Sequence, residues 1–427
     1  MKPIIYPIGN GARLFAIRTD RFKSELLSVQ YALPCAAETA QDLALVFELL
    51  RRGTERYPTK ALFHRELDDL YASSITPFNR RAGDMQLLGL NADFLGDRFV
   101  GGEGLLARVV DMMAELIYRP YFPEGHFHTP YVESEKRHLR DAIRARINSP
   151  RTYAKSKCRK LLCEGEPYAL SLIGEEDTVD AITPEALTRA RADLLATVTP
   201  TFFYVGNTDP KIVARLLADA FPLSGAGAVH YATEVKLPTG DPKQGTEQMP
   251  LCQGKLAIGY RTDISLLHPL SPAMVVLNEI FGGSAGSKLF LNVRERRSLC
   301  YHCSSTLDLF KGVLFANSGM KVSNKEATEA AIRAEFDAIV KGEITDIELE
   351  AAKRSLDHAY HQMHDNPGAM FGFYMGRALV GCDETIADRR RALSKVGRAE
   401  ICEAAEHVRE GASFFLEGTL NEEEGEE

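Results

Sequence analysis

The chain has 427 residues, 45% of them hydrophobic and 26% charged, which is enough for two or three domains with substantial cores. Its net charge of −8 argues against a nucleic-acid partner, because nucleic acids select basic surfaces. The basic runs at 136–146 and 389–391 fall on predicted helices and are interpreted as solvated helix faces. No apolar run has the length of a membrane span, so no membrane partner is expected.

The cysteines and the first residues indicate a compartment. Eight cysteines are scattered along the chain without the spacing of a disulfide framework, and the N-terminus has no long apolar segment typical of a secretory signal. We therefore predict reduced thiols and a cytoplasmic location. Cys300 and Cys303 form a C-x-x-C, but positions three apart on a strand point to opposite faces, so we expect no zinc or redox role for them.

The first half of the chain mixes strands and helices. Predicted strands lie near 28–33, 85–90 and 201–205. Predicted helices lie near 40–52, 59–71, 104–117 and 132–147, with a further short helix opened by Thr183 and Pro184. Gly53 is placed to end the first helix, and Thr59 to cap the second.

The second half follows a linker at 223–250 that is rich in glycine and proline. Its predicted strands lie near 255–260 and 298–305, and its predicted helices span 271–283, 326–339 and 346–364. Grouped strands and paired helices predict an α+β fold in which helices cover a sheet face.

Three echoes indicate that the two halves are copies of one domain. The segment from Thr201 to Asn207 returns as 413–419, and Asn148-Ser149-Pro150 returns as 365–367. A third echo links the region of Phe47 and Glu48 to that of 278–281. The echoes keep their order at offsets near half the chain length. We therefore predict an N-terminal half at 1–222, the linker at 223–250 and a C-terminal half at 251–427.

Two motifs resemble those of the pitrilysin/insulinase metallopeptidases, or inverzincins, which include the mitochondrial processing peptidase. They are Arg52-Gly53-Thr54-Glu55-Arg56-Tyr57-Pro58 and the segment 287–301, and with the duplication they extend the resemblance over the whole chain. The resemblance implies two tandem halves, each a mostly antiparallel sheet covered by helices, forming a clamshell. Within the family, 253–262 is similar to a bacterial type associated with 5-aminopentanol modification of elongation factor P. We infer no modification chemistry from that association.

Active members of the family carry H-x-x-E-H, with two histidines for zinc and a glutamate as general base. Aligned on Arg52-Gly53-Thr54, these positions fall on Ala44, Phe47 and Glu48, and the third zinc ligand falls on Ala142, with Glu135 two turns earlier. A catalytic zinc site needs three protein ligands. The resemblance therefore implies a lost zinc site and no metal in this chain. Glu48 is expected to be a buried carboxylate in need of a partner.

The C-terminal half keeps two residues of a different motif of the family. The resemblance assigns Arg294 and Tyr301, seven residues apart, to contacts with substrate carbonyls and with the oxyanion of the tetrahedral intermediate. Gly282 and Gly283 are weaker candidates, since they serve as a helix stop or as a contact with peptide.

The leading hypothesis is a non-catalytic subunit that completes the active site of an H-x-x-E-H partner, with zinc bound in that partner. A second is an inert peptide-binding homodimer or scaffold. A third is an autonomous peptidase with relocated ligands, for instance His358, His361 and His364 on one helix. Those three fan across about 120° of the helix surface, which favours an exposed face over a metal site.

Overall fold

The structure is a computed structural model that describes residues 2–102, 104–223 and 231–420. It consists of two compact units, each assembled from separate stretches of chain. Unit 1 takes the described residues of 1–144, 170–232 and 363–383, and unit 2 takes those of 145–169, 233–362 and 384–427.

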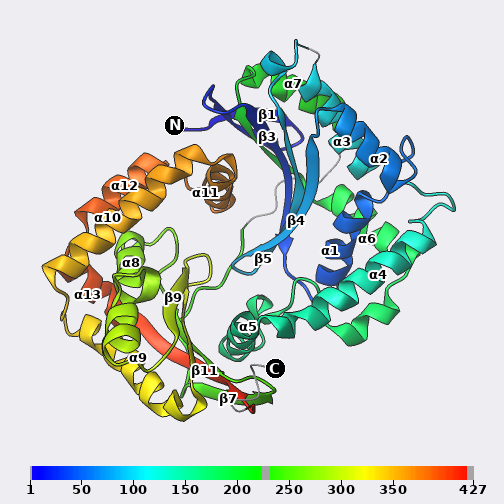
Figure 1. The fold of residues 1–427 in the computed structure, drawn as a ribbon. Coiled ribbons are helices and arrows are strands. Elements are labelled where there is room, and N and C mark those ends of the chain that lie inside the picture. The colour runs from blue at the N-terminus through cyan, green and yellow to red at the C-terminus, as the bar shows by residue number, and fades with distance from the viewer. Residues whose placement is uncertain (1, 103, 224–230, 421–427) are drawn as a thin grey trace. The chain divides into compact units, whose positions relative to one another are not determined.

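Unit 1 is built on a six-stranded sheet in the order β1-β2-β6-β3-β5-β4, in which only β2 and β6 pair in parallel (Figure 1). Its strands are β1 (Ile4–Gly9), β2 (Ala12–Arg18), β3 (Ser24–Pro34), β4 (Ser74–Ala82), β5 (Met85–Leu95) and β6 (Thr201–Gly206). Its helices are α1 (Ala40–Leu50), α2 (Lys60–Asp69), α3 (Leu105–Tyr118), α4 (Thr129–Arg144), α6 (Pro184–Thr197), α7 (Pro210–Ala220) and α11 (Pro367–Leu379). The predicted caps are confirmed: Thr59 accepts from the Leu62 amide at 3.3 Å, and Thr183 accepts from the Ala186 amide at 3.2 Å.

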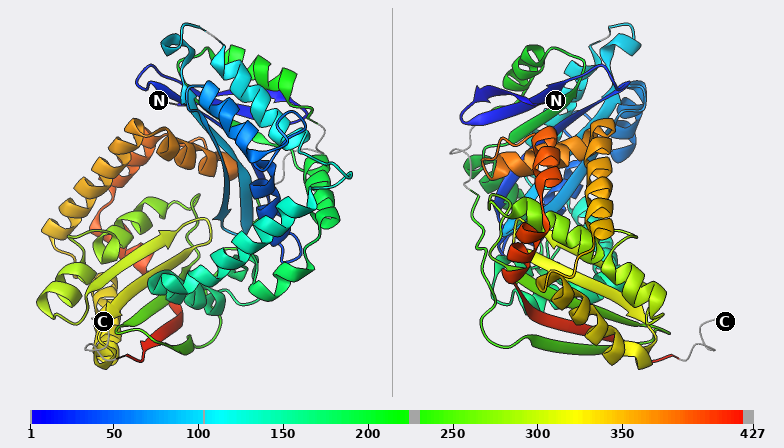
Figure 2. Two further views of the ribbon diagram at one scale, coloured as in Figure 1. Left: turned by 45° about the vertical axis from the view of Figure 1, so that its right-hand side comes forward. Right: turned by 90° about the vertical axis from the view of Figure 1, so that its left-hand side faces the viewer.

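Unit 2 is built on a five-stranded sheet in the order β7-β11-β8-β10-β9, in which only β7 and β11 pair in parallel. Figure 2 shows β11 and β7 running side by side. Its strands are β7 (Lys243–Met249), β8 (Gly254–Thr262), β9 (His302–Asp308), β10 (Val313–Met320) and β11 (Val408–Gly418). Its helices are α5 (Pro150–Leu162), α8 (Ser271–Asn278), α9 (Lys325–Val340), α10 (Asp346–Gln362), α12 (Ile386–Lys395) and α13 (Arg398–Glu406).

The two sheets confirm the predicted α+β fold and the duplication. β6 lies between a parallel neighbour, β2, and an antiparallel neighbour, β3. β11 lies in the same way between parallel β7 and antiparallel β8. β6 contains most of the repeated segment 201–207, and β11 contains most of its copy at 413–419. The two copies of the repeat therefore form equivalent strands. Among the described residues, no helix combines the length and the apolar character needed to cross a membrane.

The boundaries of the compact units differ from those of the predicted halves because each half contributes one helix to the unit that is formed mainly by the other half. α5 comes from the first half of the chain but belongs to unit 2, where Cys158 and Leu162 pack against Gly259 of β8. α11 comes from the second half but belongs to unit 1, where Phe371 contacts Phe78 and Phe203, with ring centroids 5.8 and 5.5 Å apart. Each helix begins at the proline of one copy of the repeated segment, Pro150 for α5 and Pro367 for α11, so the exchange is reciprocal.

The predicted linker at 223–250 also differs from the structure, since it contains β7. β7 is a polar edge strand, Lys-Gln-Gly-Thr-Glu-Gln-Met, and it has no hydrophobic alternation from which a strand could be predicted. Residues 224–230 of the predicted linker lie outside the described part of the chain.

Candidate functional site

The first two zinc-motif positions are part of the core of unit 1. On α1, Ala44 is buried and Phe47 is only 2% exposed. The Phe47 ring contacts Tyr31 of β3, with centroids 6.0 Å apart. The position that the family resemblance assigns to the general base is therefore occupied by an aromatic side chain that stabilises the packing of helix on sheet.

Glu48 does not lie where it was expected. It is exposed on the surface of α1, so the prediction of a buried carboxylate is wrong. Its carboxyl group still loses part of its hydration to neighbouring groups, which raises its pKa, while Arg51 acts to lower that pKa. An exposed residue flanked by buried ones is explained by the helical period, which turns one position of a largely apolar helix toward solvent.

An ion pair links the two helices that carry the zinc ligands in active relatives. Arg52, just beyond α1, pairs through Nε with the carboxylate of Glu135 on α4, and its Nη2 lies 3.3 Å from His138 Nδ1. Ala142 is exposed near the end of α4 and offers no ligand atom. These residues do not fit a zinc ion. The described residues contain no group of three or more His, Cys, Asp or Glu side chains that could hold a metal.

The Arg-Gly-Thr motif after α1 has a structural role. Thr54 Oγ1 donates to Glu115 Oε1 at 2.9 Å, and the Arg56 amide donates to the same oxygen at 3.0 Å. A Cβ on Gly53 would lie 2.5 Å from the carbonyl oxygen of Pro58, so only glycine permits this tight turn. The motif fixes the chain around the buried Glu115 carboxylate through these hydrogen bonds. This structural role does not depend on a bound zinc ion.

Arg294 and Tyr301 of unit 2 lie on the surface of a cavity of about 380 Å³. Arg294 lies on a π-helical turn, Leu289–Arg296, a rare conformation that is common at functional sites. Its side chain is 39% exposed; its guanidinium lies 4.7 Å from the centroid of the Phe290 ring and 3.4 Å from the Glu295 carboxylate. Tyr301 is 46% exposed. The structure therefore places both predicted residues on one cavity.

The same cavity includes Lys321 and Asn324, which sequence reasoning missed. Both follow β10, and no family motif marks them. Asn324 Nδ2 donates to the carbonyl of Leu299 at 3.1 Å and so helps to fix the loop that leads to Tyr301. Ser298 in this loop has φ 50°, the left-handed region that ordinary side chains rarely adopt.

Cys300 and Cys303 lie together, which corrects the expectation that they point to opposite faces. β9 begins only at His302, so Cys300 precedes the strand and the two thiols are hydrogen-bonded. This hydrogen bond is the main cause that lowers the pKa of Cys300 to about 7; burial opposes it, and Ser318 and the positive charge of Arg294 assist it.

Gly282 and Gly283 end the helical segment as predicted, on a π-helical turn, Glu279–Gly283. Gly282 is buried, and a Cβ there would lie 2.5 Å from the Ser305 amide of β9. Close packing of the helix on the strand therefore explains this glycine, whereas Gly283 is exposed.

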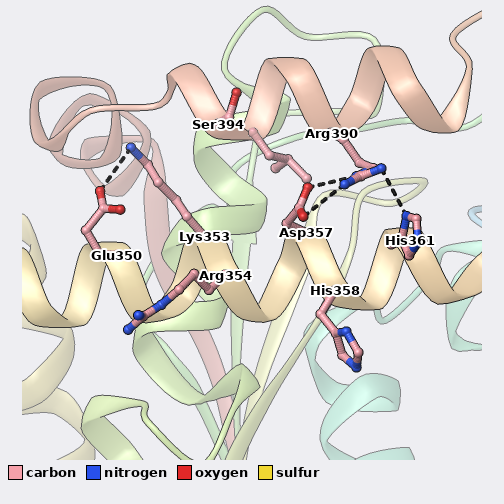
Figure 3. Close-up of a pocket in the computed structure, with 9 residues that line it drawn as sticks. Glu350, Lys353, Arg354, Asp357, His358, His361, Arg390 and Ser394 are labelled. Atoms are coloured by element: carbon pink, nitrogen blue, oxygen red, sulfur yellow. Dashed lines mark hydrogen bonds and ion pairs between the residues drawn. The ribbon is translucent and has the colours of Figure 1, made fainter.

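The histidines of α10 do not converge on one point. His361 turns toward Arg390 of α12, whose guanidinium lies 3.3 Å from His361 Nδ1 and pairs with Asp357 at 2.7 Å (Figure 3). His358 points to the other side of the helix in the same view. His364 lies beyond the end of α10, in a short 3-10 turn. The spacing of the three histidines along the helix could not predict that His361 contacts Arg390, because the spacing does not show which residues of another helix lie beside it.

The fold and the site define a peptidase-like protein whose zinc-binding half has lost its ligands. A family model described as "Peptidase M16 inactive domain" matches residues 181–356. The "Probable inactive metalloprotease YmfF" of Bacillus subtilis is 28% identical over 414 residues, which is 96% of each chain.

Solved structures show the same fold. A conserved protein from Enterococcus faecalis V583 superposes with a TM-score of 0.89 at 25% identity, over 98% of this chain and 99% of that one. A peptidase M16 inactive domain from Pseudomonas fluorescens superposes with a TM-score of 0.80 at 17% identity, over 99% of each chain. Over nearly its whole length the chain is thus similar to a probable inactive metalloprotease, and its residues 181–356 are similar to the inactive domain of the peptidase M16, or pitrilysin, family. The more specific similarity to the type associated with elongation factor P is not tested by these relatives and stays a prediction.

Proposed function

We propose that the chain is the non-catalytic subunit of a two-chain zinc peptidase, in which it binds peptide beside a partner that carries H-x-x-E-H and the zinc ion. One observation carries the proposal. The residues that would act on substrate, Arg294 and Tyr301, lie exposed on one cavity, while the zinc-motif positions Ala44 and Phe47 are used for packing. A chain kept only as a scaffold has no need for two such donors on one surface.

The chemistry of the pair suits peptide hydrolysis in trans. The Arg294 guanidinium donates hydrogen bonds to a substrate carbonyl, and the Tyr301 hydroxyl donates to the oxyanion that forms when the scissile carbonyl is attacked. Such preorganised donors contribute roughly 3 kcal/mol each to the stability of the transition state in a dry site. Zinc and the general base would come from the partner. The cytoplasmic location stays a prediction from the cysteine spacing.

The test is cleavage of a quenched mixed-peptide pool by this chain alone and by the chain mixed with H-x-x-E-H relatives from the same genome. We expect cleavage only in a mixture. Arg294→Ala and Tyr301→Phe should each lower turnover of the complex by roughly 100-fold without loss of folding or assembly. Arg296→Ala is the matched control, since Arg296 is an exposed arginine on the same π-helical turn that bonds to Asn292 at 2.9 Å.

Three results would contradict the proposal. Unchanged turnover of the Arg294 and Tyr301 variants would remove their role. Cleavage by the chain alone, abolished by a chelator, would reveal a zinc site. No cleavage in any mixture would favour the inert peptide-binding homodimer.

A further inference from the structure

One face of the unit 2 sheet is apolar where α5 covers it and basic beyond the start of that helix. Along α5 the face is apolar, with Phe315 and Phe414 in the cluster that packs against this helix. Beyond the start of the helix the face becomes basic. In the register of the strands, Gly319 of β10 pairs with Lys255 of β8 on one side and with His302 of β9 on the other.

Gly319 allows its two neighbours to approach each other. A Cβ built on Gly319 would lie 2.8 Å from His302 Nδ1 and 3.1 Å from Lys255 Nζ. The imidazole and the ammonium group therefore converge on the space above this glycine. Any side chain at this position would fill the space and push both groups apart.

The charges around this point have one sign. From α5, Arg151 Nη2 donates to Ser304 Oγ at 2.6 Å, and Ser304 lies two residues along β9 from His302 on the same face. Within the described residues, neither Arg151 nor Lys255 forms an ion pair with a carboxylate. Two acids of unit 2 have partners of their own: Glu295 lies 3.4 Å from Arg294, and Tyr168 donates to Asp308 at 2.9 Å.

Two buried polar atoms beside these cations have no hydrogen-bond partner among the described residues. They are His302 Nε2 and the Oδ1 atom of Asn317, a residue that is 2% exposed and lies two positions before Gly319 on the same face of β10. Burial first, and then Arg151, Lys255 and Arg294, lower the pKa of His302 to about 4. The imidazole is therefore neutral at physiological pH and surrounded by positive charge, an arrangement that an anion would stabilise.

We propose that Lys255, His302 and Arg151, arranged around Gly319, form a pocket for a carboxylate of a bound peptide. The inference rests on the proposed function, because the pocket adjoins the Arg294 and Tyr301 cavity. The Tyr301 amide donates to the carbonyl of Gly319 at 2.8 Å, and Arg294 is close enough to act on His302. Peptides with a carboxylate near the carbonyl that Arg294 holds are then the preferred substrate class.

The observations favour a carboxylate on a peptide over a polyanion. The chain as a whole is acidic, with a net charge of −8, so it would repel an extended polyanion. The unpartnered acceptor of Asn317 suits a backbone N–H of the peptide, which a free phosphate lacks. The carboxylate comes either from the C-terminus or from an aspartate or glutamate side chain.

The experiment measures binding by this chain alone, by fluorescence anisotropy with a mixed-sequence peptide pool labelled at its N-terminus. Four versions of the pool end in Glu or Gln, each as a free acid or as an amide. We expect the Gln amide pool to bind at least tenfold more weakly than the tightest acidic pool. Comparison of the Gln free acid with the Glu amide shows which source of carboxylate the pocket takes.

Lys255→Met should weaken binding of the acidic pool about tenfold and leave the Gln amide pool unchanged. The matched control is Lys341→Met, an exposed lysine after α9 on the same unit, which should change neither. A folded Gly319→Ala variant should also bind the acidic pool about tenfold more weakly, because its Cβ would fill the space between His302 and Lys255. Independently of these variants, NMR titration should show that the acidic pool raises the pKa of His302.

Equal binding of the acidic and amide pools, or no change in His302 titration, would overturn the pocket. Because this assay needs no partner, it separates the two proposals. Acid-dependent binding without cleavage in any mixture would support the pocket and contradict the trans role. Cleavage that depends on Arg294 but shows no preference for acidic peptides would support the trans role and contradict the pocket.

Discussion

The guanidinium of Arg52 pairs with the carboxylate of Glu135 and so ties the end of α1 to α4, the two helices that would have to hold zinc. Both side chains are largely buried, at 17% and 11% exposure. Removal of one partner of such a pair leaves an uncompensated charge and costs several kcal/mol. The ion pair thus stabilises unit 1 in the region that the family resemblance assigns to zinc binding.

Restoring the motif with Ala44→His, Phe47→Glu and Glu48→His should not restore a zinc enzyme. Ala142 still supplies no third ligand, and Phe47→Glu places a carboxylate in the core where the ring contacted Tyr31. We expect less than stoichiometric zinc by metal analysis and a loss of about 3–5 kcal/mol of unfolding free energy. The pair Ala44→His and Glu48→His, which keeps Phe47, serves as the control for the cost of the glutamate. Zinc-dependent hydrolysis by the triple variant would overturn this account of the site.

The Arg-Gly-Thr turn should be a stability element. Thr54→Val removes the hydroxyl that donates to the buried Glu115 carboxylate at 2.9 Å. Because a hydrogen bond to a charged group contributes about 1.5–3 kcal/mol, we expect a loss of that size in urea unfolding. Thr197→Val is the control, since Thr197 is exposed at the end of α6. Equal stability of the two variants would mean that Glu115 does not depend on Thr54.

Cys300 should be the reactive thiol of the chain. Its pKa of about 7 means that half of it is thiolate near neutral pH, whereas burial raises the pKa of Cys163 to about 11. The alkylation rate should rise with pH and level off above about 8. Arg294→Gln removes a positive charge that favours the thiolate, so the profile should shift to higher pH. Mass spectrometry of the alkylated peptide checks the assignment; uniform labelling of all cysteines would contradict it.

Much of the fold was predictable because local patterns and the repeat agree. The segment at 201–207 and its echo at 413–419 became equivalent strands with equivalent neighbours. The exchange of α5 and α11 was not predictable, since an amphipathic pattern shows that a helix has a buried face but not which sheet buries it.

The site was only partly predictable for a similar reason. Arg294 and Tyr301 lie close along the chain and belong to a family motif, so sequence reasoning found them. Lys255, Gly319 and His302 lie on three different strands, and only the register of the sheet brings them together. The Cys300 prediction was wrong because the strand starts later than its apolar pattern suggested.

The last prediction concerns a buried charge cluster in unit 2, where Glu166 bonds to Arg261 at 3.0 Å and to Lys311 at 2.6 Å. Lys311 is fully buried and the Arg261 side chain is 3% exposed. Burial acts to raise the pKa of Glu166, but its hydrogen bonds with the two cations outweigh burial and lower it to about 2. Glu166→Gln removes the carboxylate that the two buried cations share, so we expect a loss of about 3–5 kcal/mol near neutral pH.

The pH dependence follows from the sign of this shift. A carboxyl group whose pKa is lower in the folded state stabilises that state fully above its unfolded pKa of about 4.5, and the contribution is lost as pH falls toward 2. The difference in unfolding free energy between wild type and Glu166→Gln should therefore shrink over this range, measured by denaturant unfolding at a series of pH values. Glu164→Gln, which alters an exposed pair with Lys243, is the matched control and should change little. A difference that stays constant from pH 7 to about 3 would show that Glu166 stabilises unit 2 through its shape and not through its charge.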